Sequence, residues 1–256
     1  MSEKIETLHA VYTAGKAATT TTHRTLSEYV PGRIYDIRRA SKEGVAEFKE
    51  FVRGHFDGQP LRTDDIEFES IRKENPEAHL ALVSLTREPV AACISAWFFH
   101  FGKNYPGVDP SDWSTDKHRD AIVDGGYASR RDFFTNWFDF ECRAFTGIDV
   151  LGTGFPIDKG YETYASEKAD LLVIRSEDLN RVYQPAFQEF LGVQVGKLID
   201  HHVGEDSSYA DAYKRFKAQA VFPESFLDEQ HNTDFAQTFY SPEEIEASHA
   251  QWTRAS

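Results

Sequence analysis

Residues 8–21 read Leu8-His9-Ala10-Val11-Tyr12-Thr13-Ala14-Gly15-Lys16-Ala17-Ala18-Thr19-Thr20-Thr21. The apolar segment 8–12 predicts a first strand that ends at Thr13-Ala14-Gly15. Several threonines are suited to cap a helix that we expect over 19–29. A strand followed by a short loop and a helix is the repeating unit of α/β folds. This stretch therefore sets the fold class.

The rest of the chain repeats this alternation. Apolar and polar residues alternate over 33–38, which predicts a second strand. The nearly continuous apolar run 79–85 is typical of a central parallel strand, and 170–175 predicts a last strand. We expect helices over 42–55, 64–74, 89–101, 130–145 and 178–191, and a loop over 102–114. The pattern predicts an α/β fold of three layers (α/β/α), with a central parallel sheet covered on both faces.

Domain organisation is predicted to be simple. After Gly196 the chain becomes charged and helical, and Ser241-Pro242-Glu243-Glu244 suits the start of a closing helix. There is no internal repeat and no long linker. We therefore expect a single domain over 1–256, with a helical C-terminal segment over about 196–256.

Composition excludes some classes of protein. Of the 256 residues, 40% are hydrophobic, which is enough for a full core. The net charge of −14 argues against general nucleic-acid binding, because a phosphate backbone needs a basic surface. No apolar run approaches the roughly 20 residues that span a bilayer. There is no signal-peptide pattern, and Cys93 and Cys142 lie in apolar runs as buried thiols would. We expect a cytoplasmic protein without a membrane span.

The loop after the first strand predicts an anion site. Exposed amide groups and the helix dipole at a helix N-terminus favour negative charge. Small residues allow close approach, Lys16 supplies charge, and threonine hydroxyls supply hydrogen-bond donors. Unlike a Walker A motif, Gly15-Lys16 is followed by Ala17 and not by Ser or Thr. The candidate binding residues are Gly15, Lys16, Ala17, Ala18, Thr19, Thr20 and Thr21.

A second segment has a matching chemistry. Arg87 follows the strand 79–85, Pro89 suits the first turn of the next helix, and Ser95 lies about two turns further on. Ligands bind at the carboxyl ends of strands in open α/β sheets. Arg87 and Ser95 are therefore candidates to bind a second phosphate. Two such sites on neighbouring strands imply a nucleotide that is phosphorylated at both ends.

These motifs resemble a known family. The lysine-first order of the loop resembles the 5′-phosphosulfate loop of sulfotransferases that use 3′-phosphoadenosine 5′-phosphosulfate (PAPS). The Arg87, Pro89 and Ser95 segment resembles their 3′-phosphate site, and residues 171–179 with 190–193 resemble their late strand and helix. The resemblance implies a P-loop-like sulfotransferase fold with PAPS as donor and no metal required.

Other segments resemble a bacterial, sulfotransferase-like group of capsular polysaccharide synthesis proteins. They are Asp158-Lys159-Gly160-Tyr161, Phe222-Pro223-Glu224, and Phe239-Tyr240-Ser241-Pro242-Glu243-Glu244-Ile245. The loop of that group usually has a second glycine, where this chain has Ala18. The resemblance implies transfer of a sulfuryl group to a hydroxyl of a glycan or a small molecule.

Roles in catalysis follow from the chemistry of the transfer. Negative charge grows on the bridging oxygen of the departing nucleotide, and we expect Lys16 to stabilise it. A hydroxyl acceptor also needs a general base, and the candidates are Asp36, near the end of the second strand, and His23, one helical turn beyond Thr20. The related group often has a histidine near Asp36, so Asp36 and Arg38 depart from its pattern. We expect Asp178 to cap a helix and not to act in catalysis.

Two alternatives remain open. One is a nucleotide-dependent P-loop kinase, which the missing hydroxyl after Gly15-Lys16 disfavours. The other is a non-catalytic relative that binds nucleotide without turnover. Segments 102–114 and 133–145 are expected to line the acceptor pocket. The identity of the acceptor and the oligomeric state do not follow from the sequence.

Overall fold

The computed structural model describes residues 5–41, 46, 63–124, 134–199 and 207–253. The chain forms two compact units. The first contains Met1–Thr86 and Asn136–Ile199, and the second contains Arg87–Thr135 and Asp200–Ser256. The single domain expected from the sequence stays a prediction.

The first unit is built on a five-stranded sheet with the order β2-β1-β3-β5-β4. The strands are β1 (Thr7–Tyr12), β2 (Ile34–Ile37), β3 (His79–Thr86), β4 (Tyr161–Ala165) and β5 (Ala169–Arg175). The four predicted strands are confirmed and run parallel to one another. The prediction of an entirely parallel sheet is wrong at one edge, where β4 pairs antiparallel with β5. A tight turn joins these two strands, and such a turn permits only antiparallel pairing.

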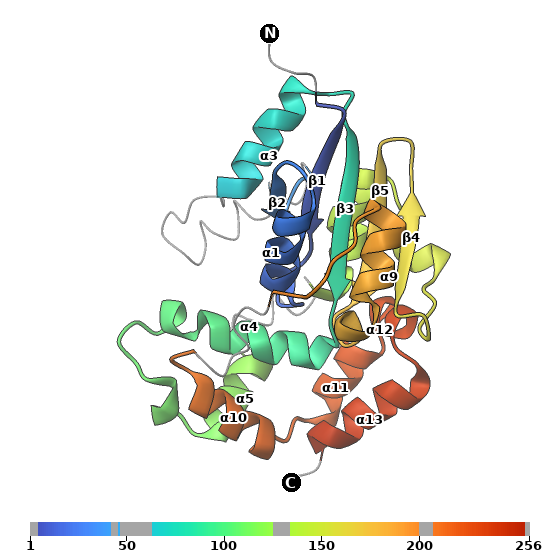
Figure 1. Cartoon of the computed structure of the whole chain (residues 1–256). Helices are drawn as coiled ribbons and strands as arrows, with labels where there is room; N and C mark the ends of the chain where they lie inside the picture. Colours follow the sequence, from blue (N-terminus) through green and yellow to red (C-terminus); the bar gives the residue numbers. More distant parts are fainter. Residues whose placement is uncertain (1–4, 42–45, 47–62, 125–133, 200–206, 254–256) are drawn as a thin grey trace. The chain divides into compact units, whose positions relative to one another are not determined.

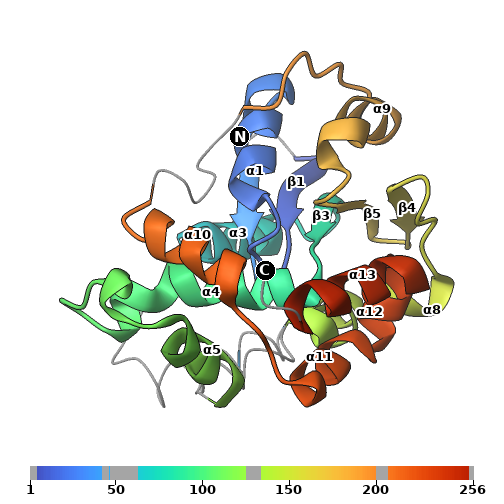
Figure 2. The same cartoon turned by 90° about the horizontal axis from the view of Figure 1, so that it is seen from below.

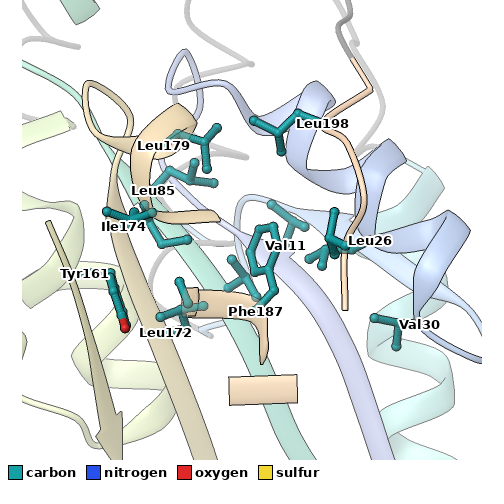
Figure 3. Packing of buried hydrophobic residues seen from close by; sticks show 14 of the residues in the cluster. Val11, Leu26, Val30, Leu85, Tyr161, Leu172, Ile174, Leu179, Phe187 and Leu198 are labelled. Atoms are coloured by element: carbon teal, nitrogen blue, oxygen red, sulfur yellow. The ribbon is translucent and has the colours of Figure 1, made fainter. Parts of the chain in front are cut away.

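Helices cover both faces of this sheet, so the three predicted layers are confirmed within the first unit. One face packs against α1 (Thr19–Tyr29) and α9 (Leu179–Leu191). Figure 3 shows Val11 and Leu172 of the sheet beside Leu26 of α1 and Phe187 of α9. The bounds of α1 are those predicted, and α9 begins one residue later than predicted.

The opposite face is covered by aromatic residues. Tyr12 of β1 contacts the rings of Trp137 and Phe145, and Phe68 contacts Tyr35 and Phe145. Phe68 belongs to α3 (Thr63–Glu74), which confirms the helix predicted there. The other helical segments of the unit are η2 (Phe138–Arg143), α7 (Ala144–Thr146) and α8 (Val150–Thr153). The described part of the helix predicted over 130–145 is helical, with a π-helical turn at η2.

The regular elements described in the second unit are helices, joined by turns and short loops. Its elements are α4 (Pro89–Asn104), η1 (Pro110–Asp112), α5 (Thr115–Asp124), α10 (Ala210–Gln219), α11 (Glu224–His231), α12 (Asp234–Phe239) and α13 (Pro242–Thr253). Figure 2 shows α11 beside α12 and α13. At the start of α13, Ser241 and Glu244 each accept a hydrogen bond from the backbone N–H of the other, which confirms the predicted cap.

One prediction for the second unit is wrong in part. The expected loop 102–114 begins only after Asn104 and contains η1, because the aromatic side of α4 continues through Phe101 and packs against Tyr105 and Trp113. Helix α5 was not predicted, since its sequence is mostly polar.

The predicted helix 42–55 lies outside the described residues, apart from residue 46. Among the described helices, none combines the length and apolar character needed to cross a membrane.

Candidate anion-binding site

The β1–α1 loop, residues 13–18, begins at the carboxyl end of β1. The N–H of Thr13 donates to the carbonyl oxygen of Ile37 (3.3 Å), which extends the pairing of β1 with β2. The Thr13 hydroxyl accepts a hydrogen bond from the N–H of Gly15 (2.7 Å) and lies 3.5 Å from the Thr19 hydroxyl. Thr13 and Thr19 are both buried. The two threonines therefore join the start of the loop to the start of α1.

Three residues of this loop have left-handed backbone conformations. The φ angles are +94° at Gly15, +63° at Lys16 and +53° at Ala18. In the part of the chain that the structure describes, Lys16 and Ala18 are the non-glycine residues with positive φ. Each costs about 1–2 kcal/mol for an L-residue, and such strain is concentrated at functional sites. Successive backbone N–H groups in a turn can also point into a common concavity that binds anions.

The N-terminus of α1 lacks a side-chain cap from its own N-cap residue. Its N-cap residue, Ala18, makes no side-chain capping hydrogen bond, and the first turn contains no acidic residue. Thr20 is exposed and Thr21 is half-buried, whereas Thr19 is buried against Thr13. The first turn of α1 itself therefore supplies no carboxylate to neutralise the positive end of the helix dipole. Of the three predicted threonine ligands, Thr20 and Thr21 are the ones whose side chains reach solvent.

A second cation lies against the loop. The Nε atom of Arg38 is 3.1 Å from the point that a Cβ atom on Gly15 would occupy. The Arg38 guanidinium donates to both carboxylate oxygens of Asp36, from Nη1 to Oδ1 and from Nη2 to Oδ2 (3.4 Å). Only 17% of the Arg38 side chain and 12% of the Asp36 side chain are exposed. Asp36, a predicted base, is thus engaged in a largely buried ion pair.

The other predicted base, His23, connects α1 to β2. Its Nε2 atom lies 2.9 Å from the carbonyl oxygen of Ile34. A carbonyl oxygen only accepts hydrogen bonds, so Nε2 carries the proton. The basic nitrogen of the neutral ring is therefore Nδ1.

A buried carboxylate supports the segment that follows β2. Glu141 is fully buried and its Oε1 atom accepts hydrogen bonds from the Tyr12 hydroxyl (2.7 Å), from the N–H of Ala40 and from the N–H of Ser41 (3.0 Å). The Ser41 hydroxyl donates to Oε2 (2.5 Å). One turn earlier, Trp137 donates from Nε1 to the carbonyl oxygen of Arg38 (3.2 Å). Trp137 and Glu141 together form what we call the η2 clamp.

Burial also controls the protonation of groups near the clamp. Burial, followed by the charge of Glu141, raises the pKa of Tyr12 well above its usual value. Burial raises the pKa of the Cys142 thiol to about 12. Both groups therefore stay protonated at neutral pH, and Tyr12 acts as a hydrogen-bond donor. Cys93 and Cys142 are free, buried thiols, which confirms the prediction.

Arg87 and Ser95 fall in the second unit. Arg87 directly follows β3 and is half-buried, and Ser95 is half-buried on α4. The N-terminus of α4 is capped by Glu88, which accepts from the N–H groups of Val90 (3.2 Å) and Ala91 (2.6 Å). Pro89 is the first residue of the helix, as predicted. A phosphate at this position would be held by side chains, because a carboxylate already satisfies the first helix amides.

Several other predicted residues have structural surroundings. Asp178 stands at the N-cap position of α9, but its side chain makes no capping hydrogen bond, so that prediction is wrong. Its carboxylate pairs instead with Arg175 (3.0 Å) and Arg181 (2.7 Å), because these two guanidinium groups lie on either side of it. Within the described ranges, no group of three or more His, Cys, Asp or Glu side chains is placed to hold a metal ion.

Sequence reasoning missed the residues that support the loop. The sequence marks Arg38 only as a departure from a family pattern, and it places Trp137 and Glu141 only within the helix expected over 130–145. A weak signal exists, since Glu141 stands between Phe140 and Cys142, four residues after Trp137. Nothing local links it to Ser41, which is 100 positions away.

Comparison with known proteins gives one match. The model of a protein family described as "Putative capsular polysaccharide synthesis protein" (NKWYS) matches residues 130–241. This region includes the η2 clamp and excludes the β1–α1 loop and Arg87. No curated protein and no solved structure matches the chain. The chain is therefore similar to this family over less than half of its length.

Proposed function

We propose that this chain is a cytoplasmic sulfotransferase that transfers a sulfuryl group from PAPS to a hydroxyl of a glycan or small-molecule acceptor. The observation that carries the proposal is the β1–α1 loop. It combines left-handed residues, a lysine before the hydroxyls, and an uncapped helix N-terminus at the carboxyl end of β1. This arrangement favours a phosphate-like group.

The position of the loop in the sheet supports a nucleotide site. β1 lies between β2 and β3, and the chain leaves β1 toward β2 before it returns to form β3 on the other side. Such a reversal of strand order is where ligands bind in open α/β sheets. Lys16 follows β1 and Arg87 follows β3 in the sequence, and the assignment of a second phosphate to Arg87 rests on that sequence pattern.

The proposed roles follow from this chemistry. Lys16, Thr20, Thr21 and the amides after Gly15 bind the 5′-phosphosulfate, and the ammonium group of Lys16 stabilises charge on the bridging oxygen. Arg87 and Ser95 bind the 3′-phosphate. A positioned lysine supplies this stabilisation without a metal ion.

The general base is proposed to be Asp36 or His23. Both oxygens of Asp36 are held by Arg38, so an acceptor hydroxyl would have to share the carboxylate with the guanidinium. His23 would accept a proton at Nδ1, because Nε2 is committed to Ile34.

The similarity to the capsular polysaccharide synthesis family supports a glycan acceptor. Capsular polysaccharide synthesis is a process that handles sugar hydroxyl groups, and the match covers residues 130–241. The similarity indicates a glycan-related enzyme, and a sulfated sugar hydroxyl is the product that fits both the loop and this family.

The proposal is tested by incubating the purified protein with sulfur-labelled PAPS and a panel of sugars and small alcohols. We expect labelled product together with 3′,5′-ADP. Lys16→Ala and Arg87→Ala should each reduce donor use at least tenfold, about 1.4 kcal/mol. The control is Lys73→Ala, which removes a lysine from an exposed pair with Glu69 on α3 and should leave transfer unchanged. Normal activity in both test variants would show that the assigned donor site is wrong.

A further inference from the structure

Arg38 is held at the carboxyl end of β2 by contacts on both sides of its backbone. Its N–H donates to Oδ1 of Asp65 on α3 (2.9 Å), and its carbonyl oxygen accepts from Trp137 (3.2 Å). Two and three residues later, the N–H groups of Ala40 and Ser41 donate to the buried Glu141. Segments far apart in the sequence therefore fix the position of Arg38.

The side chain of Arg38 is directed toward the β1–α1 loop. Its Nε and Cδ atoms lie 3.1 and 3.7 Å from the Cβ position of Gly15, so a side chain at this position would crowd Arg38. Asp36 fixes the plane of the guanidinium through both of its oxygens. A guanidinium that is already oriented loses little rotamer entropy when it binds an anion.

Arg33, at the opposite end of the same strand, shows what an ordinary surface arginine looks like here. Its side chain is 53% exposed and pairs with Asp64 (3.1 Å) and Glu67 of α3. Among the described residues, the η2 clamp makes its hydrogen bonds to the backbone after Arg38 and not to the backbone of Arg33. The two arginines carry the same charge on the same strand, but only Arg38 lies against the loop.

We propose that Arg38 is a second cation of the β1–α1 loop and binds the same phosphosulfate or phosphate group as Lys16. A planar guanidinium offers several donors to a phosphate, whereas a lysine acts as a point charge. The inference rests on the proposed function only for the identity of the anion, since the contact between Arg38 and the loop holds for any phosphate-like ligand.

Calorimetry with inorganic pyrophosphate and with 3′,5′-ADP tests this role. The proteins compared are the wild type, Arg38→Met, Arg38→Lys and the matched control Arg33→Met. We expect Arg38→Met to bind both ligands at least tenfold more weakly. Arg38→Lys should recover part of the loss, because lysine restores the charge but not the planar set of donors of the guanidinium. Arg33→Met should bind within about twofold of the wild type. Unchanged binding by Arg38→Met, or an equal loss in Arg33→Met, would overturn the inference.

The two ligands separate this inference from the proposed function. If the wild type binds pyrophosphate but not 3′,5′-ADP, and Arg38→Met loses pyrophosphate, the inference holds and the sulfotransferase proposal fails. If Arg38→Met keeps the affinity of the wild type for 3′,5′-ADP, the inference fails and the proposed function stands. If the wild type binds neither ligand, both fail. Thermal unfolding checks that each variant is folded, and Arg38→Lys decides the outcome if Arg38→Met does not fold.

Discussion

The two junctions at which a parallel strand passes into a helix differ in how the helix N-terminus is satisfied. Between β1 and α1, the chain takes a strained loop, and the N-cap residue Ala18 makes no side-chain cap. Between β3 and α4, the chain turns within two residues, and the Glu88 carboxylate accepts from the N–H groups of Val90 and Ala91. The second junction supplies its own anion, whereas the first has a lysine and no carboxylate in the loop.

This difference shows which helix N-terminus is suited to bind a ligand. Free helix amides and an unneutralised dipole favour an external anion, and a carboxylate cap removes both. The α4 N-terminus is satisfied within the protein, and Glu88 also accepts hydrogen bonds from His231 and Ser248 (both 3.0 Å). In the proposed donor site, Arg87 and Ser95 would therefore act through their side chains, while the α1 N-terminus would also offer backbone amides.

The largest expected effect is on the free energy of unfolding, when Glu88 is removed from the β3–α4 junction. Glu88→Ala removes the cap of α4 and leaves the donors of His231 and Ser248 without their acceptor. We expect a loss of about 2 kcal/mol in the free energy of unfolding, measured by urea denaturation. Pyrophosphate binding at the β1–α1 loop should not change. A loss of that binding in folded Glu88→Ala protein would contradict the independence of the two junctions.

A smaller effect is expected when the first junction is made to resemble the second. Ala18→Asp places a carboxylate at the N-cap of α1, where the left-handed backbone tolerates Asp and Asn. This internal anion should weaken pyrophosphate binding at least tenfold in calorimetry, about 1.4 kcal/mol, and raise thermal stability slightly. Ala18→Asn is the matched control, because it can cap without charge and should bind pyrophosphate more tightly than Ala18→Asp. Equal affinities for the two variants would show that the helix dipole does not contribute to binding.

The smallest expected effect is on the pH dependence of the free energy of unfolding, through His118 of α5. His118 is buried beneath α4, where its Nδ1 accepts from Trp97 (2.9 Å) and its Nε2–H donates to the carbonyl of Pro110 (2.9 Å). Burial lowers its pKa from 6.5, with a smaller effect in the same direction from the charges of Arg215 and Lys117. The unfolded chain then binds more protons, so this stabilisation is complete above about pH 6.5 and is lost as the pH falls toward the folded-state pKa.

Urea unfolding between pH 8 and 5, followed by tryptophan fluorescence, measures this dependence. The wild type should lose more stability on acidification than His118→Asn, whose side chain does not titrate. An identical pH dependence in both proteins would show that His118 is not the group responsible.

The sequence predicts those parts of the fold that local patterns determine. Segment 8–29 gives the first strand and the bounds of α1 because apolar residues, small residues and threonines mark the start and end of each element. The apolar run 79–85 gives β3 for the same reason. β4 was missed because Tyr161–Ala165 alternates only weakly and is defined by its pairing with β5.

The candidate site is only partly visible in the sequence. Gly15 and Lys16 were found because their order along the chain carries chemical information. The left-handed conformations of Lys16 and Ala18 were not, since no local preference places a lysine or an alanine there. The support of Arg38 by Trp137 and Glu141 depends on contacts between segments about a hundred positions apart, which a single sequence does not reveal.

The most direct test of the account compares the binding of 3′,5′-ADP and of ATP with Mg²⁺ to the wild-type protein by calorimetry. A loop that binds one phosphate, together with Arg87 and Ser95 for a second, predicts tight binding of 3′,5′-ADP and none of ATP with Mg²⁺. The reverse result, binding of ATP with Mg²⁺ and not of 3′,5′-ADP, would contradict the proposed sulfotransferase and favour a P-loop kinase.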